Sequence, residues 1–432
     1  DSTEKHPVMM RRTPYSCTPY GEGNFKNFWE TYHVSYCREK YIMVFQDVRG
    51  RYMSEGEFAD VRPFNPNKKS STDIDEASDT YDAIDWIIKN IPYNNKKVGV
   101  SGISYPGFYS TMAALSNHPA LKAVSPQAPV TDWFMGDDFH HNGAFMLFDG
   151  FQFYKDFGVP RPKPLQEYNK GYIRKEIDAY KFYLEGGHLQ NFTHNYFGDS
   201  IAFWNEMMNH PNYDAWWKAR NPRSFVKNIK PAMLIVGGLF DAEDCFGAWS
   251  LYKAIEKNNP SNSYNKIVMG PWFHGAWGGK SDGSKLGKIQ FGTKTSEWYQ
   301  QHIEFPFFQY YLKGIGNLSN IKEANIFFSG ENNWKQFEQW PPKEVQHQPI
   351  YLQSNHGLSF NHPRPPGLCE PAFDWSEYTS DPANPVPHEG GVIKERTREY
   401  MSADQRFASK RSDVLTFTTD TLQKNITLSG PL

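Results

Sequence analysis

The sequence has few cysteines, no long apolar run and no excess of one charge. None of its four cysteines stands in a C-x-x-C pair, which argues against a zinc site or a thioredoxin-like redox pair. No apolar stretch approaches the roughly 20 residues that a membrane-spanning helix needs. The 46 basic and 48 acidic residues are mixed along the 432-residue chain and leave a net charge of -2. We therefore expect neither nucleic acid nor an anionic membrane as a partner.

Strand-like sequence lies close to both ends of the chain. Residues 7–15 (PVMMRRTPY) predict a core strand almost at the start, and the chain stops on the strand-like segment TLQKNITLSGPL. We expect a longer precursor, and we expect that uncovered sheet edges make this chain less stable than an extended form. A disulfide between Cys17 and Cys37 stays open, and the sequence does not decide the state of Cys245 or Cys369.

The first 144 residues alternate between strand and helix signals. Residues 74–90 place apolar side chains at spacings of three and four, as one face of a helix does. An order of strand, helix, strand, helix, strand predicts a parallel sheet with crossover helices, and the same alternation returns over residues 225–315. The main predicted strands are YIMVFQDV (41–48), KKVGVSG (96–102), LKAVSPQAP (121–129), PAMLIVGG (231–238) and NKIVMGPW (265–272).

Two other regions follow different patterns. Residues 145–224 are rich in aromatic and charged side chains at helical spacing, so we expect a helical insertion in the α/β domain. An amphipathic helix is expected over 302–314. Residues 316–432 contain short alternating runs, ANIFFSG, IYLQSN and DVLTFTTD, separated by Pro-, Gly- and Asn-rich loops. These runs predict an antiparallel β domain at the end of an otherwise α/β protein.

A serine stands at the predicted junction of a strand and a helix. The sequence Gly102-Ile103-Ser104-Tyr105-Pro106-Gly107 follows the strand KKVGVSG and opens the next helix. Small residues around a serine allow the sharp, strained turn that lifts a nucleophilic Oγ out of a sheet. The second glycine of the usual G-x-S-x-G stands one place late, so an ordinary Gly-rich loop is the alternative. The position of Ser104 favours a nucleophile.

A base and an acid stand where such a nucleophile needs them. Asp241 follows the strand PAMLIVGG, and His274 follows NKIVMGPW at the end of the predicted sheet. The order Ser104, Asp241, His274 is that of α/β-hydrolase triads. A loop histidine is usually surface decoration, but none of the other candidates has this context: His118, His140, His141 and His302.

A metal site was weighed at His140 and His141, next to Asp137 and Asp138. Adjacent residues on a strand or helix point apart, which makes them poor partners for one metal ion. We expect no metal and no cofactor.

Several motifs carry a family resemblance across nearly the whole chain. They are SGISYPGFY, DVRGRYMSEGEF, GDDFHHNGAF, GGLFDAEDCFGA, GPWFHG, SDPANPVP and DQRFASKRSDVLTF. In these motifs the sequence resembles the α-amino acid ester hydrolases, within a wider group that includes cocaine esterase, glutaryl-type acylases and X-Pro dipeptidyl-peptidases. The resemblance implies an α/β-hydrolase domain with a helical cap over 145–224 and an incomplete jelly roll over 316–432. It also implies the triad Ser104, Asp241 and His274.

The oxyanion hole and a substrate site are expected from position and resemblance together. The backbone N–H of Tyr105 follows the nucleophile, and Tyr52 follows the strand YIMVFQDV, where the family has a tyrosine hydroxyl donor. Glu243 and Asp244 crowd beside Asp241 in one loop, where acids repel one another unless a cation or a proton relieves them. The resemblance adds Asp138 and implies that Asp138, Glu243 and Asp244 hold a substrate ammonium group.

We therefore expect a serine hydrolase and acyltransferase for small-molecule esters and β-lactam amides of α-amino acids. The alternatives are a general carboxylesterase, a glutaryl-type acylase on neutral or acidic acyl groups, and a non-catalytic binding scaffold. The resemblance further implies a homotetramer in the full-length form. A secretion signal on a longer precursor would place the protein in the periplasm or outside the cell, and without one it would be cytoplasmic.

Overall fold

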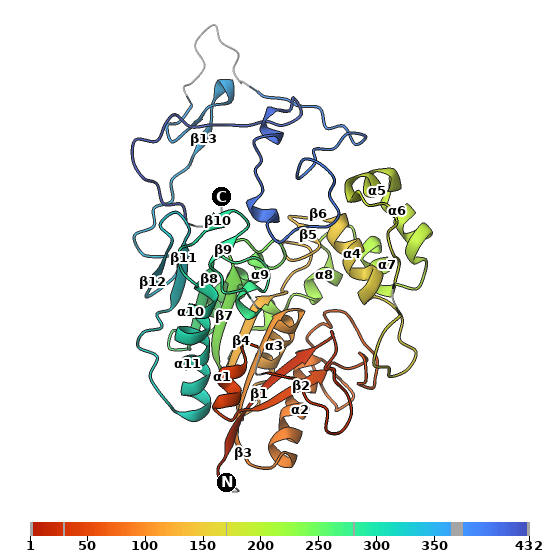
Figure 1. Ribbon diagram of the computed structural model, residues 1–432, viewed down its shortest axis with the longest axis vertical. Coiled ribbons are helices and arrows are strands. Elements are labelled where there is room, and N and C mark those ends of the chain that lie inside the picture. Colours follow the sequence, from red (N-terminus) through yellow and green to blue (C-terminus); the bar gives the residue numbers. More distant parts are fainter. Residues whose placement is uncertain (1–2, 29–30, 170, 280, 364–374, 430–432) are drawn as a thin grey trace. The chain divides into compact units, whose positions relative to one another are not determined.

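A parallel sheet organises the larger of two units in the protein (Figure 1). The computed structural model describes residues 3–28, 31–169, 171–279, 281–363 and 375–429. In this part of the chain the sheet has eight strands in the order β12-β11-β8-β7-β4-β3-β1-β2. All neighbours pair in parallel except β11 and β12. The strands are β1 (His6–Thr13), β2 (Ile42–Asp47), β3 (Asn94–Ser104), β4 (Leu121–Pro129), β7 (Ala232–Gly238), β8 (Asn265–Gly270), β11 (Ala324–Phe328) and β12 (Asn333–Phe337).

Helices pack on both faces of this sheet (Figure 1). One face carries α2 (Glu76–Asn90), α3 (Tyr105–Ser116) and α9 (Cys245–Asn258). The other face contacts α1 (Val34–Arg38) and one continuous helical run. That run confirms the amphipathic helix predicted over 302–314, although two of its turns are π-helical. It consists of α10 (Thr295–Tyr299), η4 (Gln300–Glu304), α11 (Phe305–Phe308) and η5 (Gln309–Lys313).

A buried polar network ties this helical run to the middle of the sheet. Gln127 of β4 donates from its side-chain amide to Glu304, at 2.6 Å, and accepts a 2.8 Å hydrogen bond from the indole N–H of Trp277. Burial raises the pKa of Glu304 to about 7. Because Trp277 belongs to the loop after β8, the network also fixes that loop against the sheet.

The predicted helical insertion is helical in the described residues. Between a short hairpin, β5 (His140–His141) and β6 (Ala144–Phe145), and strand β7, the described residues contain helices and loops only. Its elements are α4 (Leu147–Phe157), α5 (Ala179–Gly186), α6 (Leu189–Phe192), η1 (Thr193–Phe197), α7 (Ala202–Asn209), α8 (Ala215–Ala219) and η2 (Pro222–Phe225). Helix α5 belongs to the second unit, so the insertion does not form one body.

The boundary of the C-terminal β domain differs from the prediction. The run ANIFFSG (324–330), expected to belong to a C-terminal β domain over 316–432, forms β11 and pairs in parallel with β8. Apolar alternation alone does not tell which sheet a strand joins. The first unit therefore continues to Glu338. A second small hairpin in this unit joins β9 (Lys285–Leu286) to β10 (Ile289–Gln290).

The second unit comprises Lys175–Gly187, Gln339–Arg396 and Ala403–Leu432. Its described residues contain the hairpin of β13 (Tyr351–Leu352) and β14 (Leu358–Ser359) and an isolated bridge from Gly357 to Thr418. The run DVLTFTTD contributes only that bridge. A jelly roll is not confirmed.

Three of the four cysteines lie in the described part of the chain. Cys17, Cys37 and Cys245 are free, so the disulfide left open between Cys17 and Cys37 is not formed. Cys369 lies outside the described residues. No described helix is both long and apolar enough to cross a membrane.

The turn from β3 to α3 depends on two glycines that allow close backbone approach. A Cβ on Gly102 would lie 2.3 Å from the carbonyl oxygen of Pro106. A Cβ on Gly107 would lie 2.5 Å from the carbonyl oxygen of Gln127 and 2.9 Å from Cα of Pro129. The glycine that stands one place late in the sequence motif therefore packs α3 against β4.

We expect Gly107→Ala to lower the free energy of unfolding by about 1–3 kcal/mol, because an overpacked core must shift its backbone. Alanine itself favours a helix by about 1 kcal/mol, so a net loss reports the clash. Chemical denaturation measures the change. Gly330→Ala is the control, since a Cβ there meets nothing within 4 Å. Equal stabilities of the two variants would contradict the close approach at Gly107.

Candidate active site

The predicted site residues follow four neighbouring strands of the sheet. Ser104 ends β3, Asp138 lies in the loop after β4, Asp241 follows β7, and His274 follows β8. These strands are parallel, so their carboxyl ends meet at one edge of the sheet, where open α/β proteins bind their ligands. The topology therefore gathers residues that are up to 170 positions apart in the sequence, from 104 to 274.

Ser104 has the strained backbone of a nucleophile elbow. Its φ of 69° and ψ of -129° lie in a region that side-chain-bearing residues rarely occupy. The side chain is half-buried, and Tyr105 begins α3 directly after it. The first N–H groups of a helix have no partner within the helix, so the N–H of Tyr105 is available to a ligand beside Ser104.

His274 is held by Asp241 through a hydrogen bond. Nδ1 of His274 lies 2.9 Å from Oδ2 and 3.1 Å from Oδ1 of Asp241. Their two loops are joined by backbone hydrogen bonds, from Leu239 N–H to the Gly270 carbonyl and from Phe240 N–H to the Trp272 carbonyl. This geometry agrees with the predicted pairing of base and acid, and it fixes the imidazole with Nε2 on the side away from Asp241.

Asp241 also organises its own loop. Its Oδ1 accepts hydrogen bonds from the backbone N–H groups of Glu243, at 2.8 Å, and Asp244, at 3.0 Å. Burial alone would raise the pKa of Asp241, but the charge of His274 and these hydrogen bonds lower it. Asp241 is therefore ionised and directs the next two acids toward the same edge of the sheet.

Asp138 joins these acids from the neighbouring loop. Its backbone N–H donates to the carbonyl of Glu243 at 2.9 Å, and its Oδ2 accepts a 2.5 Å hydrogen bond from the indole N–H of Trp133. Asp138 adopts a φ of 45°, so the loop bends sharply at this residue. Burial, followed by the charge of Glu243, raises the pKa of Asp138 to about 6.

Asp244 is the most deeply buried acid of the group. It is 0% exposed, and no donor from the described residues reaches either of its carboxylate oxygens. Burial and the charges of Asp138 and Asp137 raise its pKa well above the usual range. A buried carboxyl group without donors is costly, so Asp244 needs a proton or a bound cation.

The far edge of His274 faces an acid instead of the serine. Nε2 of His274 lies 3.2 Å from Oε2 of Glu243. Within the described residues, no hydrogen bond joins Ser104 to His274. Burial lowers the pKa of His274, but the charges of Asp241, Glu243 and Asp138 outweigh burial and raise the pKa to about 10. His274 is therefore an imidazolium at neutral pH in this state.

Two aromatic residues that the sequence analysis did not single out pack against Tyr105, the residue after Ser104. The ring of Trp133, which donates to Asp138, packs edge-on against Tyr105 with centroids 5.4 Å apart. Tyr15 lies 6.3 Å from Tyr105 between ring centroids. Tyr15 follows β1 at the carboxyl edge of the sheet, and its position after a predicted strand could have indicated it. Nothing in the sequence indicated the direction of the Trp133 side chain.

Tyr52 lies in the loop after β2, at the same edge of the sheet. Its carbonyl accepts hydrogen bonds from the Arg161 guanidinium, at 2.7 Å, and from Leu165 N–H, at 3.0 Å, and its ring packs on Tyr168. These contacts fix the loop, and the half-buried ring has a raised pKa because of burial. Donation from its hydroxyl to an oxyanion stays a prediction.

Two residues of the alternative metal site, His140 and Asp137, have other partners. His140 Nδ1 lies 2.7 Å from the Trp133 carbonyl, and Oδ2 of Asp137 accepts from Thr131 and Asp132. In the described part of the chain, Glu243, Asp244 and His274 bring donor atoms within 4.8 Å of one another. Such a spacing admits a small cation, and an ammonium group matches the acidic side chains as a metal ion does.

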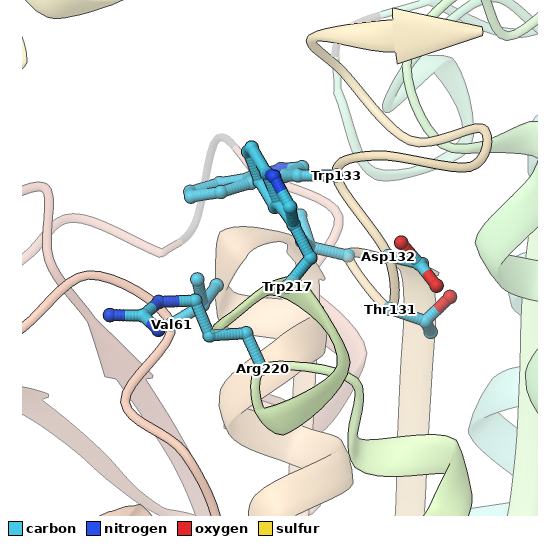
Figure 2. A pocket seen from close by; sticks show the side chains of 7 residues that line it. Val61, Thr131, Asp132, Trp133, Trp217 and Arg220 are labelled. Carbon is cyan, nitrogen blue, oxygen red and sulfur yellow. The ribbon is translucent and has the colours of Figure 1, made fainter. Parts of the chain in front are cut away.

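A small cavity lies behind Trp133 (Figure 2). Its room is that of about one water molecule, too little for a substrate. Asp132 in its lining accepts hydrogen bonds from Tyr213, Asn221 and Arg223. We therefore interpret this cavity as a packing gap next to Trp133 and not as a substrate site. Its lining residues are Val61, Val130, Thr131, Asp132, Trp133, Trp217 and Arg220.

The sheet and the strained serine define an α/β-hydrolase-like fold. Comparison with known families gives the particular group: the chain belongs to the X-Pro dipeptidyl-peptidase (S15) family, which matches residues 1–276. The resemblance inferred from the sequence motifs is thereby confirmed, and the protein is a hydrolase of this group of serine esterases and peptidases.

Individual relatives agree with this family. The chain is 24% identical over 444 residues to the cocaine esterase of Rhodococcus sp. (strain MB1 Bresler), covering 98% of this chain and 71% of the esterase. An aminopeptidase from a marine sediment archaeon, Thaumarchaeota archaeon, superposes with a TM-score of 0.87 at 32% identity, covering 98% of this chain and 68% of that one. An α-amino acid ester hydrolase gives a TM-score of 0.85 at 32% identity, covering 98% and 69%.

We expect the ring of His274 to stay protonated through neutral pH and to titrate near 10. Asp241→Asn should lower this pKa by about 1 unit or more, because it removes the closest charge that stabilises the imidazolium. Long-range ¹H–¹⁵N NMR of the histidine rings measures the pKa of His274 in the unaltered protein and in the Asp241→Asn variant. The signal of His274 is assigned by its loss in His274→Gln. Titration at the ordinary value of 6.5 would show that the acids do not act on His274.

Proposed function

We propose that the protein hydrolyses esters and amides of α-amino acids through an acyl-enzyme on Ser104. One observation carries the proposal: the acids Asp138, Glu243 and Asp244 meet at the sheet edge where β3 ends in Ser104, and neither carboxylate oxygen of buried Asp244 accepts a hydrogen bond from the described residues. A substrate with a free α-ammonium group supplies the missing positive charge and three N–H donors. The two structural relatives at 32% identity are named for substrates of this kind, an aminopeptidase and an α-amino acid ester hydrolase.

In the proposed reaction, Ser104 Oγ attacks the substrate carbonyl carbon while His274 Nε2 takes the hydroxyl proton. Asp241 stabilises the resulting imidazolium through Nδ1. The backbone N–H of Tyr105 and the hydroxyl of Tyr52 donate to the oxyanion. When the tetrahedral intermediate collapses, the alcohol or amine leaves with the proton from His274, and Ser104 keeps the acyl group. Water, activated by the same base, then releases the amino acid.

Acyl transfer follows from the same intermediate. If an amine replaces water in the second half of the reaction, the acyl-enzyme yields a new amide instead of a free acid. A β-lactam amine is one such acceptor, and the proposal includes it on the strength of the family resemblance alone. The helical cap, the jelly roll, a tetramer and a periplasmic or secreted location rest on the same resemblance and are likewise proposals.

The acidic site favours this function over the alternatives. A glutaryl-type acyl group would bring another carboxylate beside Asp138 and Glu243, which like-charge repulsion disfavours. A general carboxylesterase for neutral acyl groups has no use for a buried acid without a donor, such as Asp244. The paired His274 and Asp241 and the strained Ser104 argue for catalysis and against a binding scaffold.

Ser104→Ala should reduce turnover of phenylglycine methyl ester by about 10³ to 10⁶ and leave the fold intact. The reason is that the variant lacks the Oγ that carries the acyl group in the proposed intermediate. Initial rates measure the loss, circular dichroism checks the fold, and mass spectrometry after phenylmethylsulfonyl fluoride locates the labelled serine. Ordinary activity in the variant, or a label on another serine, would remove Ser104 from its role.

Asp138→Asn should raise KM for phenylglycine methyl ester by about tenfold or more, and KM for phenylacetate methyl ester far less. The two esters differ only in the α-amino group, so their comparison isolates recognition of the ammonium. Steady-state kinetics on both substrates give the two ratios. An equal effect on both esters would move the assignment to a neutral-ester hydrolase.

A further inference from the structure

We propose that Glu243 determines specificity by holding the catalytic edge of His274 until a substrate ammonium group draws its carboxylate away. This inference rests on the proposed function, since it concerns how the same acids act on the base. It goes beyond ammonium binding, because it makes the substrate's charge a condition for the base to work.

The geometry places two claims on one nitrogen atom. Nδ1 of His274 is bound to Asp241, so only Nε2 remains for the proton of Ser104. In the structure Nε2 is 3.2 Å from the carboxylate of Glu243 instead. An imidazole nitrogen has a single site in the ring plane, so it cannot face the carboxylate and the serine at once. Catalysis requires Glu243 to give up this contact.

Glu243 is built to move its side chain alone. Its backbone N–H is bound to Asp241 and its carbonyl accepts from the N–H of Asp138, so the main chain is fixed on both sides of the residue. The side chain is 26% exposed, whereas those of Asp241 and Asp244 are 0% exposed. Of the three acids after β7, Glu243 is therefore the one with room to turn from His274 toward a ligand.

The charges that face His274 are mostly negative. Asp241 and Glu243 face it from the loop after β7, and the charge of Asp138 acts from the loop after β4. Asp244 lies 3.9 Å from Nδ1, but its pKa is raised well above the usual range, so its carboxyl group holds a proton. The phenol of Tyr15 lies near the same acids, and Arg398 stacks on the adjacent Phe273. Among the described residues, no Lys or Arg forms an ion pair with Asp138, Asp241 or Asp244. The imidazolium is thus the main cation within this acid group.

An incoming ammonium group would replace the imidazolium as the cation next to these acids. The exchange balances: the substrate cation enters, Glu243 turns to it beside Asp138, Asp244 keeps its proton, and His274 releases one proton from Nε2 to solvent. Neutral His274 can then accept the proton of Ser104. A neutral ester brings no replacement charge, so the base stays protonated and occupied. The raised pKa of His274 in the empty site agrees with this order of events.

Glu243→Gln tests the idea because the two esters should respond in opposite directions. We expect kcat/KM for phenylacetate methyl ester to rise about tenfold near neutral pH, since removing one charge within 4 Å lowers the pKa of the base by about one unit. We expect kcat/KM for phenylglycine methyl ester to fall, because an ammonium ligand is lost. Glu243→Ala should behave alike and excludes an effect of the new amide. Glu206→Gln, which removes an exposed carboxylate, should change neither ester.

The outcomes separate this inference from the proposed function. If Asp138→Asn discriminates between the esters but Glu243→Gln leaves or lowers activity on phenylacetate methyl ester, the gating role of Glu243 is wrong and the ammonium site stands. If Asp138→Asn shows no discrimination, the proposed function itself fails. Asp138→Asn also removes a charge that raises the pKa of His274, so the gate is supported by a rise on the neutral ester that is clearly larger in the Glu243 variants than in Asp138→Asn.

Proton release gives a second readout that a purely structural role would not move. Phenylglycinol carries the ammonium group, and 2-phenylethanol lacks it. Calorimetry in buffers of different ionisation enthalpy, below the pKa of the amine, should show about one proton released per phenylglycinol bound. The Glu243→Gln enzyme should release clearly less. Binding of phenylglycinol to the unaltered enzyme without proton release would overturn the exchange.

Discussion

The hydrogen bond between Asp241 and His274 is the interaction on which the site depends. Asp241 accepts from His274 and from two backbone N–H groups, so one buried carboxylate joins the loops after β7 and β8 and directs Glu243 and Asp244. Because these loops follow adjacent parallel strands, the base lies at the carboxyl edge of the sheet, where β3 also ends in Ser104. The order of the strands brings the loops together, and the ionised side chain of Asp241 then joins two of these loops.

Concentrating acids around a histidine has a chemical consequence. In the proposed function Asp138 and Glu243 attract a substrate ammonium group. The charges of the same two residues stabilise the imidazolium form of His274, so recognition and base strength are coupled in this proposal. Trp133 donates a hydrogen bond to Asp138 and packs against Tyr105, the residue after the nucleophile. Tyr15 packs against Tyr105 as well. Asp132, the residue before Trp133 in the chain, accepts hydrogen bonds from Tyr213 and Arg223.

Sequence periodicity predicted the central sheet well and its borders less well. The runs that became β2, β3, β4, β7 and β8 are short, apolar and punctuated by turns, and buried parallel strands look like this in any chain. The run ANIFFSG has the same local pattern, yet it joins the main sheet as β11 beside β8. Pairing partners are set by contacts between distant segments, which local alternation does not encode.

By itself the sequence determined the strand and helix order, the elbow at Ser104 and the loops that carry Asp138, Asp241 and His274, because motif spacing and strand ends are local properties. Only the tertiary structure decided the side-chain contacts: that Trp133 donates to Asp138, that Asp244 is buried without a donor, and that Glu243 faces Nε2 of His274. Such contacts depend on packing between loops from different strands, and a residue's neighbours in the chain do not specify them.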